Sequence, residues 1–463
     1  MKRLLFLIAA TALLGLTACS KMLDAVAPRH AITTDKVGEN DLGKLTSGVL
    51  YTMEGFVNSG WFDGDLMGEN FTNGPGGGKV DDVTLMTPST SFVESRWKNA
   101  FTSLRQVNEL LASARSASAS PTAENALKTG YFCRALIYFG LTTRWGAAPV
   151  LEKTTNEEVP LTQAEGLYAF MLSDLAEALK HPASRTGFFY VGDDAVNALM
   201  AKVYLWSGDA AKAAEYAEKV ITSGSYAMEK TSEDLAKTWC FGTASKEIVF
   251  ALANQRTDSQ ITLHTSVNDT DGSWNYRIPY PTAETPDVKD LFSSLFADVA
   301  GLKTGDIRKS VVESEAAKNR ILKFPNGNDA MDQFVTNDNP LQSPLVVIRV
   351  SEMYLVKAEA LGNTPEGHAA LEDFLRNRYG MASVPATLSD KAWTDLLLDE
   401  YRREFYAEGH RWFDIKRLGR LDRLETLAGR DYLMRWPIPQ GQIDLLKDKG
   451  AYPQNPGYTV TKP

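Results

Sequence analysis

The stretch 197–221 limits the fold more than any other part of the sequence, because it carries small residues at helical spacing. It reads NALMAKVYLWSGDAAKAAEYAEKVI. Ala198 and Ala201 share one face of a helix, and Ala213 and Ala217 share one face of the next. The Ser-Gly-Asp sequence at 207–209 ends the first helix. Small residues let two helices approach closely, so the stretch predicts a tightly packed helix pair.

Similar patterns elsewhere extend this prediction to the fold class. The pair resembles a tetratricopeptide-type repeat unit. A second clear pair is predicted in the range 352–379, and the ranges 92–145 and 162–207 have similar proportions. About four such pairs are enough to stack into a superhelix, so we predict a mostly α, tetratricopeptide-like helical-repeat scaffold. The helices expected from periodicity span 41–56, 92–111, 122–144, 162–180, 193–207 and 210–223.

Residues 225–345 interrupt the helical periodicity. They contain a short β-like run at 247–252, many Asp, Asn, Gly and Pro residues, and one short helical stretch near 288–299. This composition predicts a large loop-rich insertion. A shorter turn-rich excursion is predicted at 58–89, and the tail after Leu427 is also irregular.

The N-terminus has the pattern of an export signal. Two basic residues precede the apolar stretch 4–16, which is too short to span a bilayer core of about 30 Å. It ends in Leu-Thr-Ala-Cys, which resembles the lipobox of bacterial lipoproteins and implies cleavage before Cys19 and lipid on that cysteine. An ordinary signal that happens to contain a cysteine is the alternative. The predicted organisation is a signal peptide (1–18), a lipidated cysteine and tether (19–40), an N-terminal helical region (41–224), the insertion (225–345) and a C-terminal region (346–463).

Composition and motifs argue against several kinds of chemistry. The net charge is −9 and no long basic run exists, which argues against a nucleic-acid partner. The five histidines are scattered without metal-ligand spacing, and no Gly-x-Ser-x-Gly elbow occurs. We therefore expect no enzyme, no cofactor and no metal centre, although a weak Ca²⁺ site at 268–272 and a disulfide between Cys133 and Cys240 stay open. A glycoside hydrolase also stays open, because paired carboxylates have no recognisable spacing.

The segment 399–420 carries the densest charge pattern and reads DEYRREFYAEGHRWFDIKRLGR. Its glutamates at 400, 404 and 408 lie four residues apart and share one helix face. Arginine forks among aromatic residues favour bidentate pairing with these carboxylates. We predict a partly buried, structural ion-pair network of Arg349, Glu352, Glu400, Arg402, Glu404, Glu408, Arg411, Asp414 and Arg417.

This segment closely resembles the C-terminal signature of the SusD/RagB family of Bacteroidetes surface lipoproteins, although Tyr401 replaces the usual arginine. Arg349 to Ala360 resembles another helix of that family, and Pro437 to Pro439 and Gln454 to Tyr458 resemble its terminal hallmark. Near the N-terminus the similar positions are Trp97, Asn108, Arg134, Ala135, Tyr138, Phe139, Trp145, Gly146 and Pro149.

The resemblance implies a binding protein rather than an enzyme. Family members are anchored by lipid to the outer face of the outer membrane. Each captures a nutrient, often an oligosaccharide and sometimes a peptide, and delivers it as a hinged lid to a TonB-dependent, SusC-like transporter. A lipoprotein glycoside hydrolase and a helical-repeat scaffold without a ligand are the alternatives.

The family motifs do not carry the ligand surface, so its residues must come from the loops. Sugar rings stack on aromatic planes, and polar groups fix their orientation. We predict one stacking platform at Trp274 and Tyr276 and another that includes Trp61. Trp97, Trp145 and Trp206 lie in helical patterns and are expected in the core. The predicted ligand-binding residues are Trp61, Phe62, Asn70, Trp274, Asn275, Tyr276, Arg277 and Tyr280.

Overall fold

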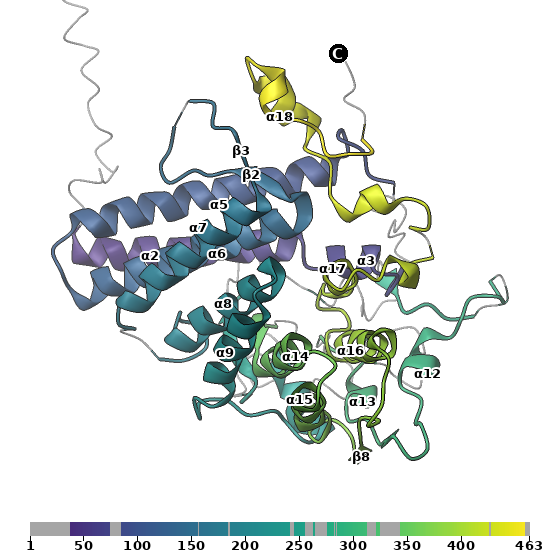
Figure 1. Cartoon of the computed structure of the whole chain (residues 1–463). Coiled ribbons are helices and arrows are strands. Elements are labelled where there is room, and N and C mark those ends of the chain that lie inside the picture. The colour runs from purple at the N-terminus through teal and green to yellow at the C-terminus, as the bar shows by residue number, and fades with distance from the viewer. Residues whose placement is uncertain are drawn as a thin grey trace, which may run out of the picture.

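The computed structural model describes residues 38–74, 85–155, 157–183, 186–240, 245–254, 263, 276–281, 283, 285–312, 321–324, 343–425 and 427–458. The described part is mostly helical, as predicted (Figure 1). Its first half contains α2 (Glu39–Ser59), α3 (Asp63–Met67), α5 (Ser91–Ser116), α6 (Pro121–Trp145), α7 (Ala164–Lys180), α8 (Asp193–Ser207) and α9 (Ala210–Ile221). The later helices are α10 (Ser232–Ala236), α12 (Leu291–Leu295), α13 (Lys309–Val312), α14 (Val350–Leu361), α15 (Pro365–Leu375), α16 (Asp390–Glu404), α17 (Arg411–Arg417) and α18 (Gln440–Leu445).

The strands are short and pair two by two. They are β1 (Thr72–Asn73), β2 (Ala147–Pro149), β3 (Leu161–Gln163), β4 (Ile248–Leu252), β5 (Tyr276–Arg277), β6 (Lys303–Thr304), β7 (Leu345–Arg349) and β8 (Met381–Ala382). Within the described residues the antiparallel pairs are β1 with β5, β2 with β3, β4 with β7, and β6 with β8.

Local sequence signals set the ends of the helices. The Ser120 hydroxyl accepts a hydrogen bond from the Ala123 backbone N–H at the start of α6 (3.2 Å). Gly208 ends α8 with a left-handed φ of 87°, and the Asp209 carboxylate then caps α9 by accepting from the Lys212 N–H (3.1 Å). This cap and stop explain why the predicted break falls at 207–209.

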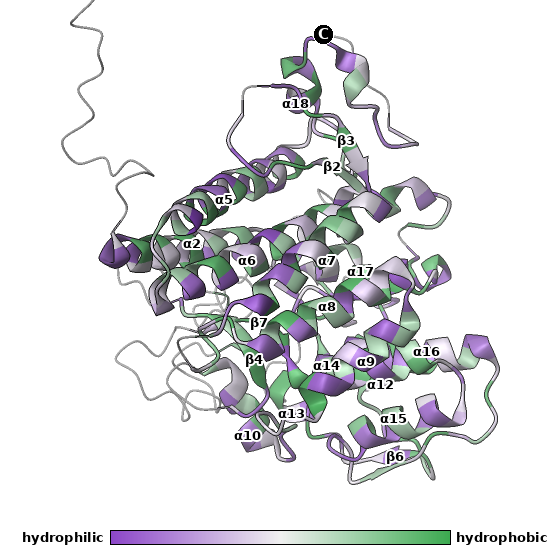
Figure 2. Cartoon of the chain, turned by 60° about the vertical axis from the view of Figure 1, so that its left-hand side comes forward, coloured by the Kyte–Doolittle hydropathy of each residue, from purple (hydrophilic) through white to green (hydrophobic). Residues whose placement is uncertain are grey.

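The helices form the predicted tetratricopeptide-like stack. Each of α5, α6, α7, α8 and α9 packs against the next, and α2 packs across α5 and α6. Figure 2 shows these helices as successive layers. The stack continues from α9 directly to α14 and then α15, so the chain between α9 and α14 leaves the stack and returns to it.

Small side chains make the close packing of α8 and α9 possible. Ala201, Ala213 and Ala217 have no exposed surface. Tyr204 and Tyr216 stack at the edge of the pair, with ring centroids 5.4 Å apart. The small residues thus set the distance between the helices, and the two tyrosines fill the space beside them.

A buried bidentate ion pair fastens α6 to α7. The Arg134 guanidinium donates to both carboxylate oxygens of Asp174, at 2.8 and 2.7 Å. It also donates to the side-chain oxygen of Asn108 on α5 (3.1 Å). One arginine therefore holds three successive helices in register.

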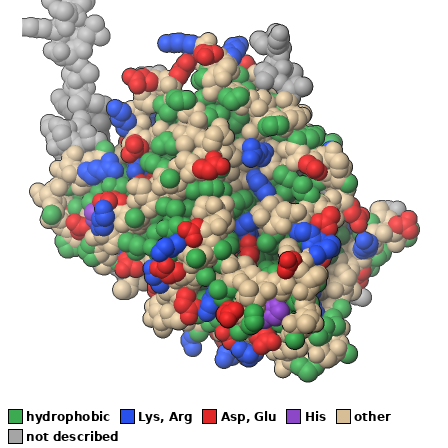
Figure 3. Space-filling model, viewed as in Figure 1, with side chains coloured by type: hydrophobic (Ala, Val, Ile, Leu, Met, Phe, Trp, Pro, Cys, Tyr) green, Lys and Arg blue, Asp and Glu red, His purple; other side chains and the backbone are tan. Residues whose placement is uncertain are grey.

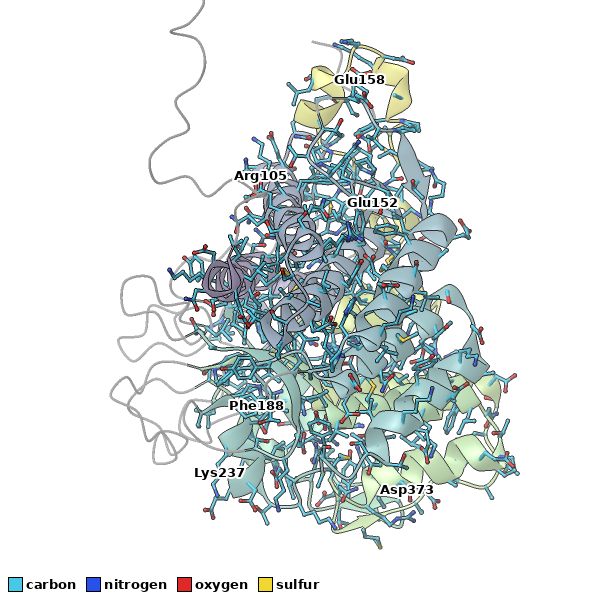
Figure 4. All side chains as sticks on the ribbon, turned by 90° about the vertical axis from the view of Figure 1, so that its left-hand side faces the viewer. Arg105, Glu152, Glu158, Phe188, Lys237 and Asp373 are labelled. Carbon is cyan, nitrogen blue, oxygen red and sulfur yellow. The ribbon has the colours of Figure 1, made fainter. Side chains whose placement is uncertain are left out.

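The segment between α9 and α14 is anchored by β4. All five residues of β4 are buried, and β4 pairs with β7, which leads straight into α14. The backbone N–H of Ala251 also donates to the Phe188 carbonyl (2.8 Å), and Figure 4 labels Phe188. The β-like run expected at 247–252 is β4, and the helix expected near 288–299 is the shorter α12.

The C-terminal tail contacts the first half of the chain. The tail packs on the loop after β2, where the Lys447 N–H donates to Glu158, which lies beside α18 in Figure 4 (2.5 Å). The signal peptide, Cys19 and most of the tether lie outside the described residues, as does the candidate Ca²⁺ stretch 268–272. Among the described helices, none combines the length and apolar character needed to cross a membrane.

The two remaining cysteines do not form a disulfide. Cys133 and Cys240 are both free and buried. Burial raises the pKa of the Cys133 thiol to about 12, which keeps it protonated. The open question of a disulfide is therefore answered in favour of two buried thiols.

Candidate functional site

The last turn of α16 lies at the centre of a buried ion-pair cluster. Glu404 accepts hydrogen bonds from Arg349 (2.8 Å) and Arg378 (2.8 Å). Both arginines also pair with Glu247, at 2.9 and 2.7 Å. Glu408, in the turn after α16, pairs with Arg349 (2.8 Å) and Lys323 (2.6 Å). Residues from β7, from the loop after α15 and from the insertion therefore meet around one helix end.

The cluster continues along α16 through Glu400. Arg308 pairs with Glu400 (2.9 Å) and Asp306 (2.8 Å), and Arg403 pairs with Glu400 (2.7 Å). We call the whole set the ionic cluster. Its members are Glu247, Asp306, Arg308, Lys323, Arg349, Arg378, Glu400, Arg403, Glu404 and Glu408.

The ionic cluster balances five basic against five acidic side chains. Burial by itself would raise the pKa of Glu404, but Arg378 and Arg349 hold it well below its usual range. Burial would likewise lower the pKa of Arg349, and the charges of Glu408 and Glu404 keep it raised. These groups are therefore charged together, and removing one leaves its partners buried without compensation.

Other predicted members of the network lie elsewhere. Arg402 donates to the Asn70 side-chain oxygen (2.7 Å) and the Glu69 carbonyl (2.9 Å), which ties α16 to the turn after α3. Arg411 donates to the Leu398 carbonyl (3.0 Å). The structure thus divides the set proposed from the sequence into the ionic cluster and several separate contacts.

Two of those separate contacts connect the helical stack to the C-terminal region. Glu352 pairs with Lys202 of α8 (2.7 Å). Arg417 forms a fork with both carboxylate oxygens of Glu359 (2.7 and 2.8 Å) and also pairs with Asp414 (2.9 Å).

The pairing of β1 with β5 joins the first excursion to the insertion. Asn73 lies opposite Tyr276, and Thr72 lies opposite Arg277. This register stacks Tyr276 on Phe71, with centroids 5.8 Å apart and planes 8° from parallel. Pairing of two distant segments thus places aromatic side chains together.

Further ring contacts extend this group. Phe62 lies 6.4 Å from Tyr276 and 6.4 Å from Phe324, and Trp61 lies 6.4 Å from Phe324, all between centroids. We call this set the aromatic cluster. Its members are Trp61, Phe62, Phe71, Tyr276 and Phe324.

The predicted ligand-binding residues occupy different environments in and around this cluster. Phe62, Tyr276, Arg277 and Tyr280 are half-buried and keep surface available for contact. Trp274 and Asn275 lie outside the described residues. The residues that sequence reasoning missed are Phe71 and Phe324, which carry no local pattern that distinguishes them from core residues.

Trp61 and Asn70 lie in the interior rather than on an exposed platform. Trp61 is 7% exposed, and its indole N–H donates to the Ala407 carbonyl (3.0 Å). Asn70 is 1% exposed and donates to Asp65 (2.6 Å) while accepting from Arg402. Their polar atoms form hydrogen bonds within the protein, so these side chains support the loop rather than present an outer face.

Taken together, a helical-repeat stack carries an inserted, aromatic-rich surface whose base is fixed by buried ion pairs. This architecture defines a tetratricopeptide-like helical scaffold. Residues 303–426 match the model of the SusD family. A relative, SusD-like protein P2 of Formosa agariphila, is 24% identical over 433 residues, which cover 82% of this chain and 83% of that protein.

Solved structures have the same fold. A SusD superfamily protein of Bacteroides thetaiotaomicron has a TM-score of 0.73 and 22% identity over 91% of this chain and all of its own. NanU of B. fragilis has a TM-score of 0.73 and 17% identity over 93% of this chain and all of its own. A structure described as a laminarin binding SusD-like protein has a TM-score of 0.69 and 20% identity over 90% of this chain and 99% of its own.

These matches confirm the resemblance to the SusD/RagB family. This is a family of nutrient- and glycan-binding proteins rather than enzymes, typically associated with the outer membrane. The expectation of a binding protein agrees with this assignment.

Proposed function

We propose that this protein is a surface-exposed lipoprotein that captures an oligosaccharide, or a peptide, and delivers it as a hinged lid to a SusC-like, TonB-dependent transporter. Family membership supports the general role. The lipid on Cys19 would anchor the body to the outer membrane, since acyl chains contribute about 0.8 kcal/mol for each buried CH₂. The tether that follows would leave the body free to move over the transporter.

The observation that carries the proposal is the convergence of two distant segments at the aromatic cluster. The rings of Phe62 and Tyr276 are half-buried, so part of each remains accessible. Arg277 of β5 and Tyr280 follow Tyr276 along the chain and supply polar groups. Such a combination suits a sugar, whose apolar C–H faces stack on rings while its hydroxyls form hydrogen bonds.

The ionic cluster supports motion of the ligand surface as part of one rigid body. Arg308 and Lys323 come from the insertion, and they pair with Glu400 and Glu408 of the C-terminal region. The insertion is therefore fastened to the scaffold by buried contacts rather than by its chain ends alone. A lid of this kind would close by moving the whole body about its tether.

Calorimetry with a panel of oligosaccharides and peptides tests the binding surface. We expect Tyr276→Ala to weaken binding of any ligand found by at least tenfold, because it removes a stacking face. Tyr51→Ala, an exposed tyrosine on α2, is the matched control and should change nothing. Equal affinity of the wild type and Tyr276→Ala would remove Tyr276 from the binding surface.

Purification from native outer membranes tests the partner and the anchor. We expect the full-length protein to co-purify with a large barrel protein and Cys19→Ala to be lost from the membrane. Release of shortened glycans by the purified protein would favour the hydrolase alternative. A protein that binds no ligand and retains no barrel would favour the scaffold alternative.

A further inference from the structure

A second candidate site lies in the body of the scaffold. A cavity of about 200 Å³, open to the surface on one side, lies where α2, α6, α8, α14 and α17 meet. Figure 3 shows a hollow near the centre of the face that it draws, with basic and acidic side chains next to each other. The cavity is smaller than the ~300–1,000 Å³ typical of sites for drug-sized ligands, so it suits one small unit rather than a chain.

Aromatic side chains form part of its rim. Phe139 of α6, Trp206 of α8 and Phe413 of α17 line the cavity and are each half-buried. Phe139 and Trp206 meet edge to face, with centroids 6.1 Å apart. Sequence reasoning assigned Trp206 to the core, yet its ring keeps part of its surface at the cavity.

The remaining wall is polar and ordered by ion pairs. Lys202 pairs with Glu352 (2.7 Å), and Arg417 pairs with Glu359 and Asp414. Asp414 is 1% exposed, and its second carboxylate oxygen, Oδ2, accepts no hydrogen bond from the described residues. A buried acceptor of this kind favours a ligand that can donate a hydrogen bond to it.

The charges of the wall favour a neutral ligand. Four Lys and Arg side chains line the wall, and each has a carboxylate partner. Lys202 pairs with Glu352 and Arg417 with Glu359, while Arg144 and Arg96 share Asp63 (3.2 and 3.1 Å). An anionic ligand would compete with these partners and would face the acidic lining residues Glu352, Glu408 and Asp414. A cationic ligand would instead face the four basic groups, so either charge would be repelled by part of the wall.

We propose that this cavity binds a single neutral sugar unit, with hydroxyls directed at Asp414, Lys202 and Glu352 and an apolar face on Trp206. The inference rests on the proposed carbohydrate-binding function and adds a second site to it. Trp61 connects the two sites, because it lines the cavity and also contacts Phe324 of the aromatic cluster.

Calorimetry with simple methyl glycosides tests the proposal. The probes are the methyl glycosides of glucose, galactose and N-acetylglucosamine, with glucuronate and glucosamine as charged counterparts. We expect a neutral glycoside to bind and Trp206→Ala to weaken that binding at least tenfold. Tyr204→Ala removes an aromatic ring from the same helix outside the cavity wall, and it should leave the affinity unchanged.

A more conservative second variant separates a loss of binding from a folding defect. Trp206→Phe keeps an aromatic face of smaller area, so we expect it to bind two- to fivefold more weakly than the wild type with an unchanged melting temperature. The change in tryptophan fluorescence on binding should also be smaller in Trp206→Phe than in the wild type, since this ring contacts the sugar while Trp61 and Trp145 still line the cavity.

Each remaining outcome has a defined meaning. Glycan binding that depends on Tyr276 but not on Trp206 would overturn the cavity site and leave the proposed function intact. Tighter binding of glucuronate or glucosamine than of neutral glycosides would overturn the assigned ligand class. A wild-type protein that binds no mono- or oligosaccharide would overturn both the cavity site and the carbohydrate part of the proposed function.

Discussion

Replacing Glu404 by glutamine probes the ionic cluster at the point where most of its contacts meet. Oε1 of Glu404 accepts from Arg349 (2.8 Å) and Arg378 (2.8 Å). Oε2 accepts from Arg378 (2.9 Å) and Arg308 (3.3 Å). Glutamine has the same shape, but its NH₂ group must take one of these two positions. In either orientation, two hydrogen bonds become contacts between donors.

The expected cost follows from these contacts and from burial. Glu404 is 2% exposed, so water cannot replace the lost acceptor. Breaking a buried ion pair by removing one partner costs about 3–5 kcal/mol. With a urea m-value of about 3 kcal/mol/M, the unfolding midpoint of Glu404→Gln should fall by about 1–1.7 M relative to the wild type.

Urea denaturation followed by circular dichroism measures this change. The matched control is Glu425→Gln, because Glu425 pairs with Lys289 (3.2 Å) and both side chains are more than four-fifths exposed. An exposed pair of this type contributes at most about 1 kcal/mol. If Glu404→Gln and Glu425→Gln shift the midpoint equally, the ionic cluster does not stabilise the fold through its buried contacts.

Three further predictions concern pH, a glycine and a helix interface. The pKa of Glu404 is lowered in the folded protein. The contribution of this carboxylate to stability is therefore complete above its unfolded pKa of 4.5 and is lost as the pH falls through the folded pKa. The difference in unfolding free energy between wild type and Glu404→Gln, measured by urea titration, should shrink below pH 4.5 and stay constant from pH 6 to 8. Gly409→Ala should destabilise the protein more than Gly419→Ala. Both glycines have positive φ (78° and 65°), but a Cβ at Gly409 would meet the Trp61 carbonyl oxygen, whereas one at Gly419 would meet no atom within 4 Å. We expect a loss of stability of about 1–2 kcal/mol for Gly419→Ala and clearly more for Gly409→Ala, and equal losses in thermal unfolding would contradict the close approach. Ala217→Leu should lower the stability by about 1–3 kcal/mol, because it overpacks the contact between α8 and α9. Ala211→Leu, on the exposed face of α9, should lower it by less than about 0.5 kcal/mol. An Ala217→Leu variant as stable as the wild type would show that the interface is not tightly packed.

The helical scaffold was predictable because its signals are local. The alanine spacing at 198–217 predicts the contact between α8 and α9, and both helix boundaries follow from Gly208 and Asp209. Periodicity, caps and stop residues act within a few positions of the residues they organise. The expected helices consequently agree with the observed ones to within a few residues at their ends.

The ionic cluster was predictable only in part. The four-residue spacing places Glu400 and Glu404 on one face of α16, and both lie in the cluster. Their partners Glu247, Arg308 and Arg378 come from other segments and carry no local mark. A charge pattern identifies the face of a helix, but it does not identify which distant charges meet that face.

The sequence by itself therefore determined the helix pairs, their ends and the family motifs, since each depends on neighbouring residues. Tertiary structure decided the binding surfaces. The β1–β5 ribbon is only two residues long on each strand, too short for any periodicity, yet its register places Tyr276 against Phe71. Likewise, Trp206 has the sequence pattern of a core residue and becomes part of a cavity wall only because α6, α8 and α17 meet beside it. The physical reason is the same in both cases. Which side chains remain accessible depends on how distant elements pack, and the local spacing of residues in the sequence does not specify that packing.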